Sequence, residues 1–367
     1  MNNCKNGNLM KLVAFFLICA VLTCTVAYAS GTKKDQNDEE NGKTEDNLSN
    51  GDTDSNTNNE NPDGTKEDPP SPDKEKQYHY ITGLETEASL ISKIPIAITL
   101  DSSLPSSCLL ACYLTIELPI ENGETRLIGF TDDALTLSKI GSLSSTRDYF
   151  LNVCSYFGAI SLYFGRDSSI NKEKSLNEIN IKECIGYYFN EEAGYFTSGE
   201  LLSMLIIEKG IATVRPSNTG VPYTHVSVES EPVMYSDTAK SVKILYSDSN
   251  YTEISYSSDS QSYRVTKQSG ALSPSDGAVC EYKNAFILFA DAVTYESSNS
   301  TVFSMNTSTG GRGYYFTMGT YKEITWALND KGELIFSLEN GDKLTVNRGT
   351  SYISYVKSSG TDKVSIS

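Results

Sequence analysis

Residues 31–77 set the first limit on what this chain can fold into. The segment carries fourteen Asp and Glu residues, six Lys residues and almost no apolar side chain. Without apolar surface to bury, a segment cannot offset the conformational entropy that is lost on folding. We therefore expect a disordered, acidic linker over 30–77. A folded core has to come from the residues after it, which are enough for two modest domains.

An apolar run at 12–27, LVAFFLICAVLTCTVA, precedes this linker. It follows a polar start with two lysines and ends in an A-x-A site, so we predict an export signal over 1–29 that is cleaved after Ala29. The run is shorter than the ~20 residues of a spanning helix. Two alternatives stay open: lipidation at Cys24, although Thr23 stands where such signals have Gly or Ala, and retention of the run as an anchor. The predicted location is extracytoplasmic, either secreted or tethered to the outer face of the cell membrane.

The charge of the chain excludes one class of partner. The formal net charge is −17, and the part after the linker is still acidic. Because contact with phosphates needs a basic face, we expect no nucleic-acid partner. Contact with a membrane is expected only through the N-terminus, if the anchor is retained or lipidated.

Five cysteines remain after the signal, an odd number for an exported protein stapled by disulfides. They are Cys108, Cys112, Cys154, Cys184 and Cys280. The CLLAC spacing of Cys108 and Cys112 would allow a bridge, but it lacks the second pair of a zinc site and its surroundings are apolar. We expect buried free thiols and no metal site, with a Cys108–Cys112 bridge left open.

Residues 78–225 alternate between the two hydrophobic periods. Apolar or alternating segments predict strands at 94–103, 112–120, 124–132 and 159–165. Helical spacing predicts a helix over 144–157, capped by Ser144 or Ser145, and a clearer one over 197–210 that is stopped by Gly210. This mixture predicts an N-terminal α/β sandwich domain over 78–225.

Residues 226–358 are richer in strand patterns. Short Tyr- and Ser-rich segments are followed by a buried strand at 285–293. The segment from 313 to 356 then alternates like an antiparallel meander, with Asn340-Gly341 as its strongest turn signal. We predict a β-rich C-terminal domain over 226–358, and an α+β fold for the chain as a whole.

A site for an anion is conceivable at IGSLSSTRDYF, residues 140–150. The free amides at a helix N-terminus carry partial positive charge, and Arg147 adds a guanidinium fork. Arg126 on the neighbouring strand could face the same cleft. In the alternative, the serines only cap the helix and Arg147 pairs with Glu121, Glu124 or Asp148. We favour this alternative, because the loop has no phosphate-binding glycine pattern.

Other catalytic constellations have little support in the sequence. The two histidines, His79 and His225, have no adjacent nucleophile, and we expect His225 to pack or hydrogen-bond at the joint between the halves. Glu117 should be a surface carboxylate on the polar face of its strand. Trp326 should lie in the core of the meander rather than stack on a sugar. No catalytic residue and no cofactor is expected, whereas tyrosine-rich faces suit contact with a glycan or a protein.

Several motifs together resemble the YerB family of bacterial envelope proteins, a domain of unknown function found mainly in Gram-positive bacteria. The likeness spans nearly everything from 79 to 356. The motifs are ITGLE at 81–85, ELPIENGETRLIGF with Glu121, Gly123, Thr125 and Arg126, IGSLSSTRDYF, YFTS at 195–198, YRVTKQSGALSPSD with NAFILFAD, and GGRGYYFTMGTYKEITW. The resemblance implies a fold and an envelope location, but no reaction.

This chain departs from the family at the polar positions of the N-terminal cleft. The family's loop has two arginines, of which only Arg147 is kept, with Ser144 in place of the first. Tyr163 lies near the position of a family histidine, and Arg166 replaces a glycine. EEAG at 191–194 replaces a P-H-N segment. The resemblance and the helix start together predict a set of ligand-binding residues: Arg126, Arg147, Ser144, Ser145, Tyr163 and Arg166.

We expect a divergent, YerB-like protein of the cell envelope that binds rather than catalyses. Its predicted ligand is a cell-wall glycan, a peptide or an envelope protein. One alternative is an enzyme that acts on a phosphate- or sugar-containing envelope substrate through the 141–147 loop. Another is a scaffold in a membrane-associated complex.

Overall fold

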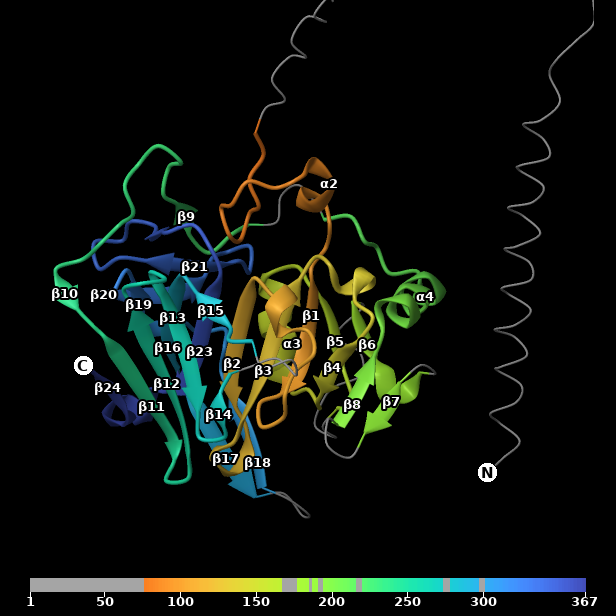
Figure 1. The fold of residues 1–367 in the computed structure, drawn as a ribbon. Helices are drawn as coiled ribbons and strands as arrows, with labels where there is room; N and C mark the ends of the chain where they lie inside the picture. The colour runs from red at the N-terminus through yellow and green to blue at the C-terminus, as the bar shows by residue number, and fades with distance from the viewer. Residues whose placement is uncertain are drawn as a thin grey trace, which may run out of the picture. The chain divides into compact units, whose positions relative to one another are not determined.

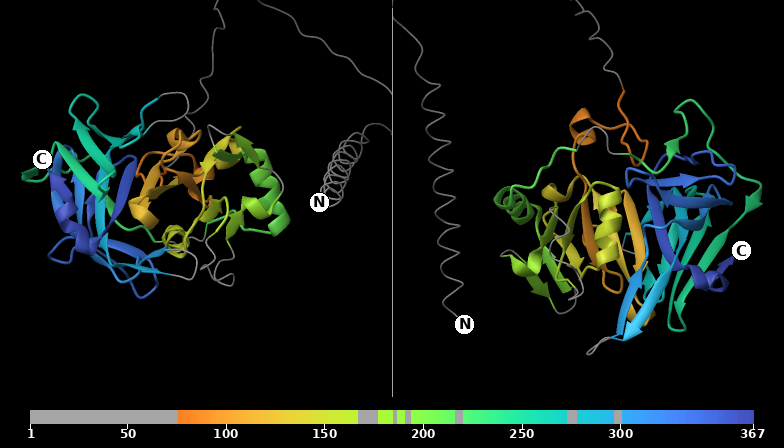
Figure 2. Two further views of the ribbon diagram at one scale, coloured as in Figure 1. Left: turned by 90° about the horizontal axis from the view of Figure 1, so that it is seen from below. Right: turned by 180° about the vertical axis from the view of Figure 1, so that it is seen from behind.

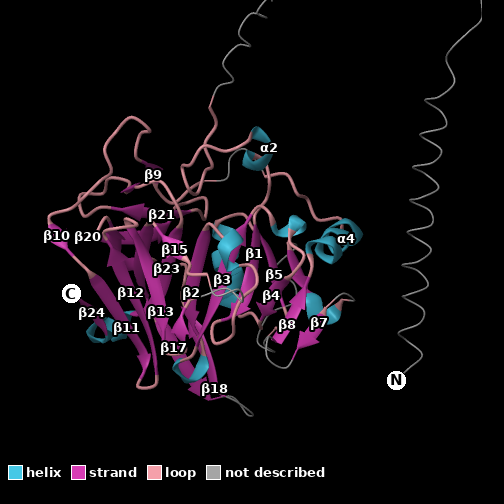
Figure 3. Cartoon of the chain, in the orientation of Figure 1, coloured by secondary structure: helices cyan, strands magenta, loops and turns pink. Residues whose placement is uncertain are grey.

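The computed structural model describes residues 76–166, 177–184, 187–190, 194–215, 220–272, 278–296 and 301–367. The predicted export signal over 1–29 and nearly all of the predicted linker over 30–77 lie outside these described residues. Strands dominate the described chain and helices are few (Figure 3). The fold is therefore mainly β, built from one large mixed sheet and one antiparallel sheet.

The described strands of the mixed sheet number fourteen, in the order β10-β20-β19-β16-β23-β2-β3-β1-β4-β8-β7, with β21 beside β20, β5 beside β1 and β6 beside β5 (Figure 1). The strands are β1 (Ile96–Asp101), β2 (Leu114–Pro119), β3 (Thr125–Thr131), β4 (Ile140–Leu143), β5 (Ile160–Tyr163), β6 (Glu178–Asn180), β7 (Tyr188–Asn190), β8 (Gly194–Thr197), β10 (Asp237–Thr238), β16 (Asn284–Ala290), β19 (Gly311–Thr317), β20 (Thr320–Leu328), β21 (Leu334–Ser337) and β23 (Ser351–Lys357).

Strand β23 joins the two halves of this sheet. It runs parallel to both of its neighbours, so that Ile353 lies opposite Ile116 of β2 on one side and Phe286 of β16 on the other. Strands from before and after residue 225 thus form one continuous sheet. The division into domains over 78–225 and 226–358 stays a prediction.

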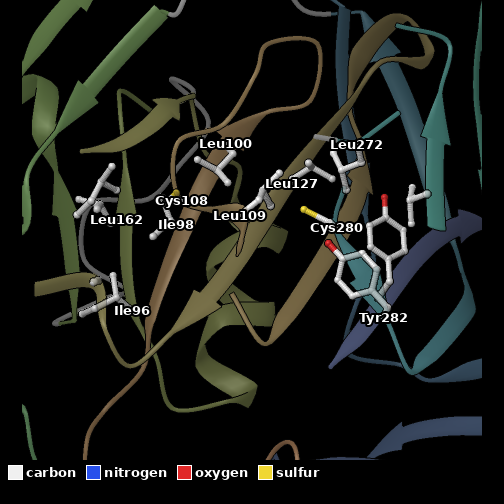
Figure 4. Packing of buried hydrophobic residues seen from close by; sticks show 14 of the residues in the cluster. Ile96, Ile98, Leu100, Cys108, Leu109, Leu127, Leu162, Leu272, Cys280 and Tyr282 are labelled. Atoms are coloured by element: carbon white, nitrogen blue, oxygen red, sulfur yellow. The ribbon is translucent and has the colours of Figure 1, made fainter. Parts of the chain in front are cut away.

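A second, antiparallel sheet packs against the middle of the first. Its described strands are β11 (Ser241–Ser247), β12 (Asn250–Ser257), β13 (Ser262–Lys267), β14 (Gly270–Ala271), β15 (Glu281–Tyr282) and β24 (Val364–Ile366). Leu272, Cys280 and Tyr282 share one buried cluster with Leu127 and Leu109 of the first half (Figure 4). The apolar surface of both halves is therefore removed from water together, which favours their association.

Two small pairs of strands complete the described sheets. They are β17 (Ala292–Glu296) with β18 (Thr301–Met305), and β9 (Thr224–His225) with β22 (Thr345–Val346). The antiparallel meander predicted after residue 313 holds for β19, β20 and β21, and the predicted turn at Asn340-Gly341 returns the chain antiparallel, with Ser337 opposite Lys343. The β9–β22 pair that follows is parallel, and β23 then enters the centre of the sheet in parallel.

The helices are short. They are α2 (Ala88–Ile91), α3 (Asp148–Tyr156) and α4 (Gly199–Lys209), with 3-10 turns η1 (Leu109–Ala111), η2 (Glu121–Gly123), η3 (Ala134–Thr136), η4 (Ile181–Glu183) and η5 (Ser358–Lys363). Helix α4 confirms the predicted signals: the Ser198 hydroxyl accepts the Leu201 N–H at 3.3 Å, and Gly210 ends the helix at φ +62°. No helix among the described residues is both long enough and apolar enough to cross a membrane.

All five cysteines are free thiols, as the sequence predicted. Four of them are buried, and Cys184 is half-buried. The Cys112 thiol donates to the backbone carbonyl of Cys108 at 3.3 Å, so it has a local partner other than a disulfide. Burial raises the pKa of Cys154 to about 12, which keeps this thiol protonated and unreactive.

Candidate functional site

Arg147 is engaged by a carboxylate of its own chain. Its Nη2 and Nε atoms donate to the two carboxylate oxygens of Glu121, at 2.7 and 3.1 Å. Burial alone would raise the pKa of Glu121, but the hydrogen bonds from Arg147 outweigh it and hold that pKa below its ordinary value. Of the two interpretations of Arg147, the ion pair with Glu121 is the one that the structure contains.

The two serines before this arginine do not cap the helix. Residues 140–143 form strand β4, and the residue at the N-cap of α3 is Arg147, whose side chain makes no capping hydrogen bond. The prediction that Ser144 or Ser145 caps the helix is therefore wrong. Backbone pairing explains the difference, because Ser144 N–H donates to Thr99 and Ser144 C=O accepts from Phe164, which keeps the chain extended past 144. The Ser145 hydroxyl accepts from Arg147 at 3.1 Å.

Arg126 pairs with a different set of carboxylates. It lies opposite Asp101 in the β1–β3 register, and its guanidinium is 3.8 Å from Asp101 and 3.7 Å from Glu124. Its Nη1 donates to the Thr125 carbonyl at 3.1 Å, whereas its buried Nε has no partner. The described chain thus holds Arg126 and Arg147 in separate ion pairs.

Tyr163 and Arg166 form a third group, centred on Glu178. The Tyr163 hydroxyl donates to one Glu178 oxygen and Arg166 Nη2 to the other, each at 2.9 Å. The Arg166 guanidinium also lies 5.6 Å from the centre of the Tyr163 ring. Burial raises the pKa of Tyr163, so its hydroxyl stays a donor. The sequence interpretation missed Glu178, because only the parallel pairing of β5 with β6 brings it beside Tyr163.

Five of the six residues predicted to bind a ligand therefore fall into three groups, whereas Ser144 pairs through its backbone with Thr99 and Phe164. In each group the positive charge is already matched by a carboxylate of the chain: Glu121, Asp101 with Glu124, and Glu178. Convergence of Arg126, Arg147 and a carboxylate in one concave site is the arrangement that an enzyme at the 141–147 loop would need. The contacts of these residues give no such arrangement.

Both histidines hydrogen-bond to backbone groups of residues 80–82. Nε2 of His79 is 2.9 Å from Asp132, and its Nδ1 accepts the Thr82 N–H at 3.2 Å, so we infer that the proton is on Nε2. The Thr82 hydroxyl lies 3.3 Å from Nδ1, but Thr82 is buried and out of reach of a substrate. His225 hydrogen-bonds the Tyr80 carbonyl at 3.1 Å, as the predicted hydrogen-bonding role requires.

Glu117 is fully buried, so its prediction as a surface carboxylate is wrong. The face of β2 that carries Thr115 and Glu117 is covered by the second sheet, where Tyr282 contacts Thr115 and Thr252 contacts Glu117. Lys267 supplies the opposite charge. Burial alone would raise the pKa of Glu117, but the Lys267 charge and the hydroxyl hydrogen bonds hold it below its ordinary value.

The exposed aromatic residues gather at the end of the large sheet that is formed by β8 and β7. Strand β7 is its last described strand, paired on one side with β8 (Figure 1). We define the aromatic hairpin as five residues of this region: Tyr187, Tyr188, Phe189, Tyr195 and Phe196. Figure 2 shows from two further sides that β7 and β8, in green, lie at the end of the sheet away from the second sheet.

Both faces of the aromatic hairpin carry rings, because neighbouring strand residues point to opposite faces. On one face Tyr188 stacks on Phe196, its partner in register, with ring centres 5.6 Å apart and planes at 23°. Lys139 Nζ lies 4.4 Å from the centre of the Phe196 ring. On the other face Phe189 lies 4.9 Å from Tyr195, which stacks in turn on Phe164 at 3.6 Å.

Three of these side chains are open to solvent. Tyr187, Tyr188 and Phe189 are 40%, 55% and 58% exposed. Scattered exposed apolar residues are ordinary, but adjacent aromatic residues on the last described strand of a sheet favour association with a ligand or partner. The sequence did carry a signal for this surface, the aromatic pairs on both sides of a polar turn in YYFNEEAGYF at 187–196.

Comparison with known proteins gives a fold but no activity. Residues 242–353 match the family described as "Protein of unknown function (DUF3048) C-terminal domain". The structure is similar to that of the YerB protein from Bacillus subtilis, with a TM-score of 0.67 and 20% sequence identity over 80% of this chain and 100% of that chain. The resemblance to the YerB family is confirmed. No curated protein matches the chain. The YerB-like assignment therefore carries no reaction and no ligand to this chain.

Proposed function

We propose that this YerB-like chain is a non-catalytic binding protein of the cell envelope, and that its aromatic hairpin binds a glycan of the wall. The carrying observation is the exposed Tyr188 ring stacked on Phe196 at the edge of a rigid sheet. The C–H-rich face of a sugar ring packs against an aromatic face, and the tyrosine hydroxyl can hydrogen-bond to the sugar hydroxyls. Rings fixed on a strand are already ordered, so little conformational entropy is lost on binding.

The charge of the hairpin supports a ligand with little net charge. Lys139 is the cation placed over its rings, and the chain as a whole is acidic. A strongly anionic polymer would be repelled by the rest of the surface. A neutral or weakly charged glycan meets no such barrier, and its binding should depend little on salt.

A second candidate follows from the position of β7 rather than from its rings. An edge strand can accept an extended peptide as an additional strand, with main-chain hydrogen bonds and alternate side chains in contact. A peptide of an envelope protein would then lie along Tyr188–Asn190. The two candidates differ in what they need, since a glycan needs the rings and an added strand needs the backbone edge.

Cosedimentation of the full-length protein with insoluble wall glycan tests the proposal. We expect Tyr188→Ala to reduce the retained fraction severalfold, because a stacked aromatic ring contributes about 0.5–1.5 kcal/mol beyond its burial. Val228→Ala is the matched control, since Val228 is also an exposed apolar residue and lies outside the hairpin. Its retention should equal that of the natural protein.

The same assay separates the two candidates. Loss of retention in Tyr188→Ala at both low and high salt supports stacking on a glycan. Equal retention by Tyr188→Ala and the natural protein would refute the glycan proposal. If purified wall glycan is not bound but wall-associated protein is, and Tyr188→Ala leaves that binding unchanged, the added-strand candidate replaces it, because an added strand needs the backbone edge rather than the ring.

A further inference from the structure

A groove lies at the end of the molecule where the β2–β3 turn meets the C-terminal strands. It encloses about 450 Å³, within the range of ~300–1,000 Å³ that is usual for sites of small molecules. Its walls come from the η2 turn, the end of β11, the β17–β18 pair and the end of β23. The residues that matter for its chemistry are Glu121, Leu245, Tyr246, Phe303, Lys357 and Lys363.

The cations of this groove are available to a ligand. Neither Lys357 nor Lys363 has a carboxylate within ion-pair distance among the residues that the structure describes. Glu121 is the anion on the groove wall, and its charge is matched by the two hydrogen bonds from Arg147. Among the described residues that line the groove, the charges not matched within the chain are therefore those of the two lysines.

The groove also offers apolar surface beside these cations. Lys357 Nζ lies 5.1 Å from the centre of the Phe303 ring, close enough for a cation–π contact that holds the ammonium at this wall. Leu245, near the end of β11, also lines the groove and is 42% exposed. Phe303, Ile120 and Val356 also line the groove but are buried, at 5%, 5% and 4% exposed.

We propose that this groove binds a small amphiphilic phosphate monoester, with its phosphate at Lys357 and Lys363 and its apolar body against Leu245. Two ammonium groups match the charge of about −1.5 to −2 that a phosphate monoester carries at pH 7. Lysine binds phosphate as a compact point charge and needs no bidentate geometry. This site is separate from the aromatic hairpin and does not depend on glycan binding.

Isothermal titration calorimetry of the full-length protein with phenyl phosphate tests the proposal. We expect K357Q/K363Q to weaken binding by about tenfold or more, since hydrogen bonds to a charged group contribute roughly 1.5–3 kcal/mol. Added salt should weaken the natural protein's binding in the same direction. Lys331→Gln, an exposed lysine in the β20–β21 turn, is the matched control and should bind as the natural protein does.

Two further ligands and one further variant test the role of the charge and the role of the apolar surface separately. Inorganic phosphate lacks the apolar body and benzyl alcohol lacks the charge, so each should bind more weakly than phenyl phosphate. Leu245→Asp should weaken phenyl phosphate without disturbing the lysines, because it places a carboxylate on the apolar wall. A thermal unfolding transition at the same midpoint temperature as that of the natural protein shows that a variant is folded.

Three results would overturn the proposal. The natural protein could fail to bind phenyl phosphate at millimolar concentration. K357Q/K363Q, while folded, could bind it as tightly as the natural protein. Inorganic phosphate could bind as tightly as phenyl phosphate, which would leave an anion site with no role for the apolar walls. Retention on wall glycan should be unchanged in K357Q/K363Q, so failure here is distinguishable from failure of the glycan proposal.

Discussion

Glu117 and Lys267 form an ion pair that bridges the two large sheets. Glu117 lies on β2 of the mixed sheet and Lys267 on β13 of the antiparallel sheet, and both side chains are buried, 0% and 4% exposed. Thr252 and Tyr352 donate to the carboxylate at 3.0 and 2.9 Å, and Lys267 also donates to Thr125 at 2.8 Å. The two halves of the chain thus share a buried polar cluster as well as an apolar core.

Removing the cation alone should destabilise the protein strongly. Lys267→Met leaves the Glu117 carboxylate buried without a counter-charge, a change that costs about 3–5 kcal/mol in buried pairs. We expect the free energy of unfolding in urea to fall by that amount. Lys331→Met, at an exposed lysine, should leave it unchanged within ~0.5 kcal/mol.

Removing both charges together should restore much of the loss. In E117Q/K267M no buried charge remains, and the amide oxygen can keep one of the two hydrogen bonds that Thr252 and Tyr352 donate to separate oxygens of Glu117. We expect this variant to be more stable than Lys267→Met alone. A loss below about 1 kcal/mol in Lys267→Met would mean that the carboxylate is protonated or hydrated, contrary to this account.

His225 should make the protein less stable below neutral pH. Burial lowers the pKa of His225 from 6.5, and the nearby charges of Arg348 and His79 lower it further, against the opposing effect of the Tyr80 carbonyl. The unfolded chain then binds a proton near pH 6.5 that the folded chain does not. This group's contribution is complete above pH 6.5 and is lost as the pH falls through that value toward the folded pKa.

Urea unfolding at pH 7.5, 6.5 and 5.5 measures this effect. The natural protein should lose stability across the series, and His225→Gln should lose less, because it cannot take up the proton. Nδ1 of His225 is buried and has no hydrogen-bond partner, so a second N–H there would have no acceptor. Equal slopes in the two proteins would assign the pH dependence to other groups.

Local patterns in the sequence predicted many of the elements correctly. Helix α4 was found because its N-cap serine, apolar period and terminal glycine lie within one segment. Strands β1, β2, β3 and β5 each fall inside a predicted range, since apolar runs bounded by turn residues specify strands without reference to the rest of the chain.

The errors arose where distant segments decide the environment. Glu117 was assigned to solvent because its strand alternates, but a sheet from more than a hundred residues later covers that face. Ser351 and Ser354 are buried in β23 between two parallel neighbours, which no local pattern of serines indicates. The sequence predicted Glu121 as one of three possible partners of Arg147. Only the tertiary structure, which brings the start of α3 to the η2 turn, shows that Glu121 is the partner.

Arg147→Lys should cost stability without affecting glycan binding. The guanidinium donates to both oxygens of Glu121, whereas an ammonium can replace only part of this geometry. We expect a loss of about 1–2 kcal/mol in the free energy of unfolding. Retention on wall glycan should match that of the natural protein. Reduced retention with unchanged stability would instead return the ligand site to the segment 141–147.

Two glycines with different surroundings should respond very differently to a methyl group. A Cβ on Gly311 would lie 2.2 Å from the Phe289 carbonyl oxygen and 3.0 Å from Trp326 Nε1, the two atoms that hydrogen-bond to each other at 3.1 Å. Gly311→Ala must therefore separate β19 from β16, and we expect a loss of about 3 kcal/mol or more. A Cβ on Gly332 meets nothing within 4 Å, so Gly332→Ala bears only the strain of its φ of +75°, about 1 kcal/mol. Urea unfolding of the two variants compares these losses. Equal losses in the free energy of unfolding would show that β16 and β19 can move apart at little cost. Backbone strain alone would then account for both losses.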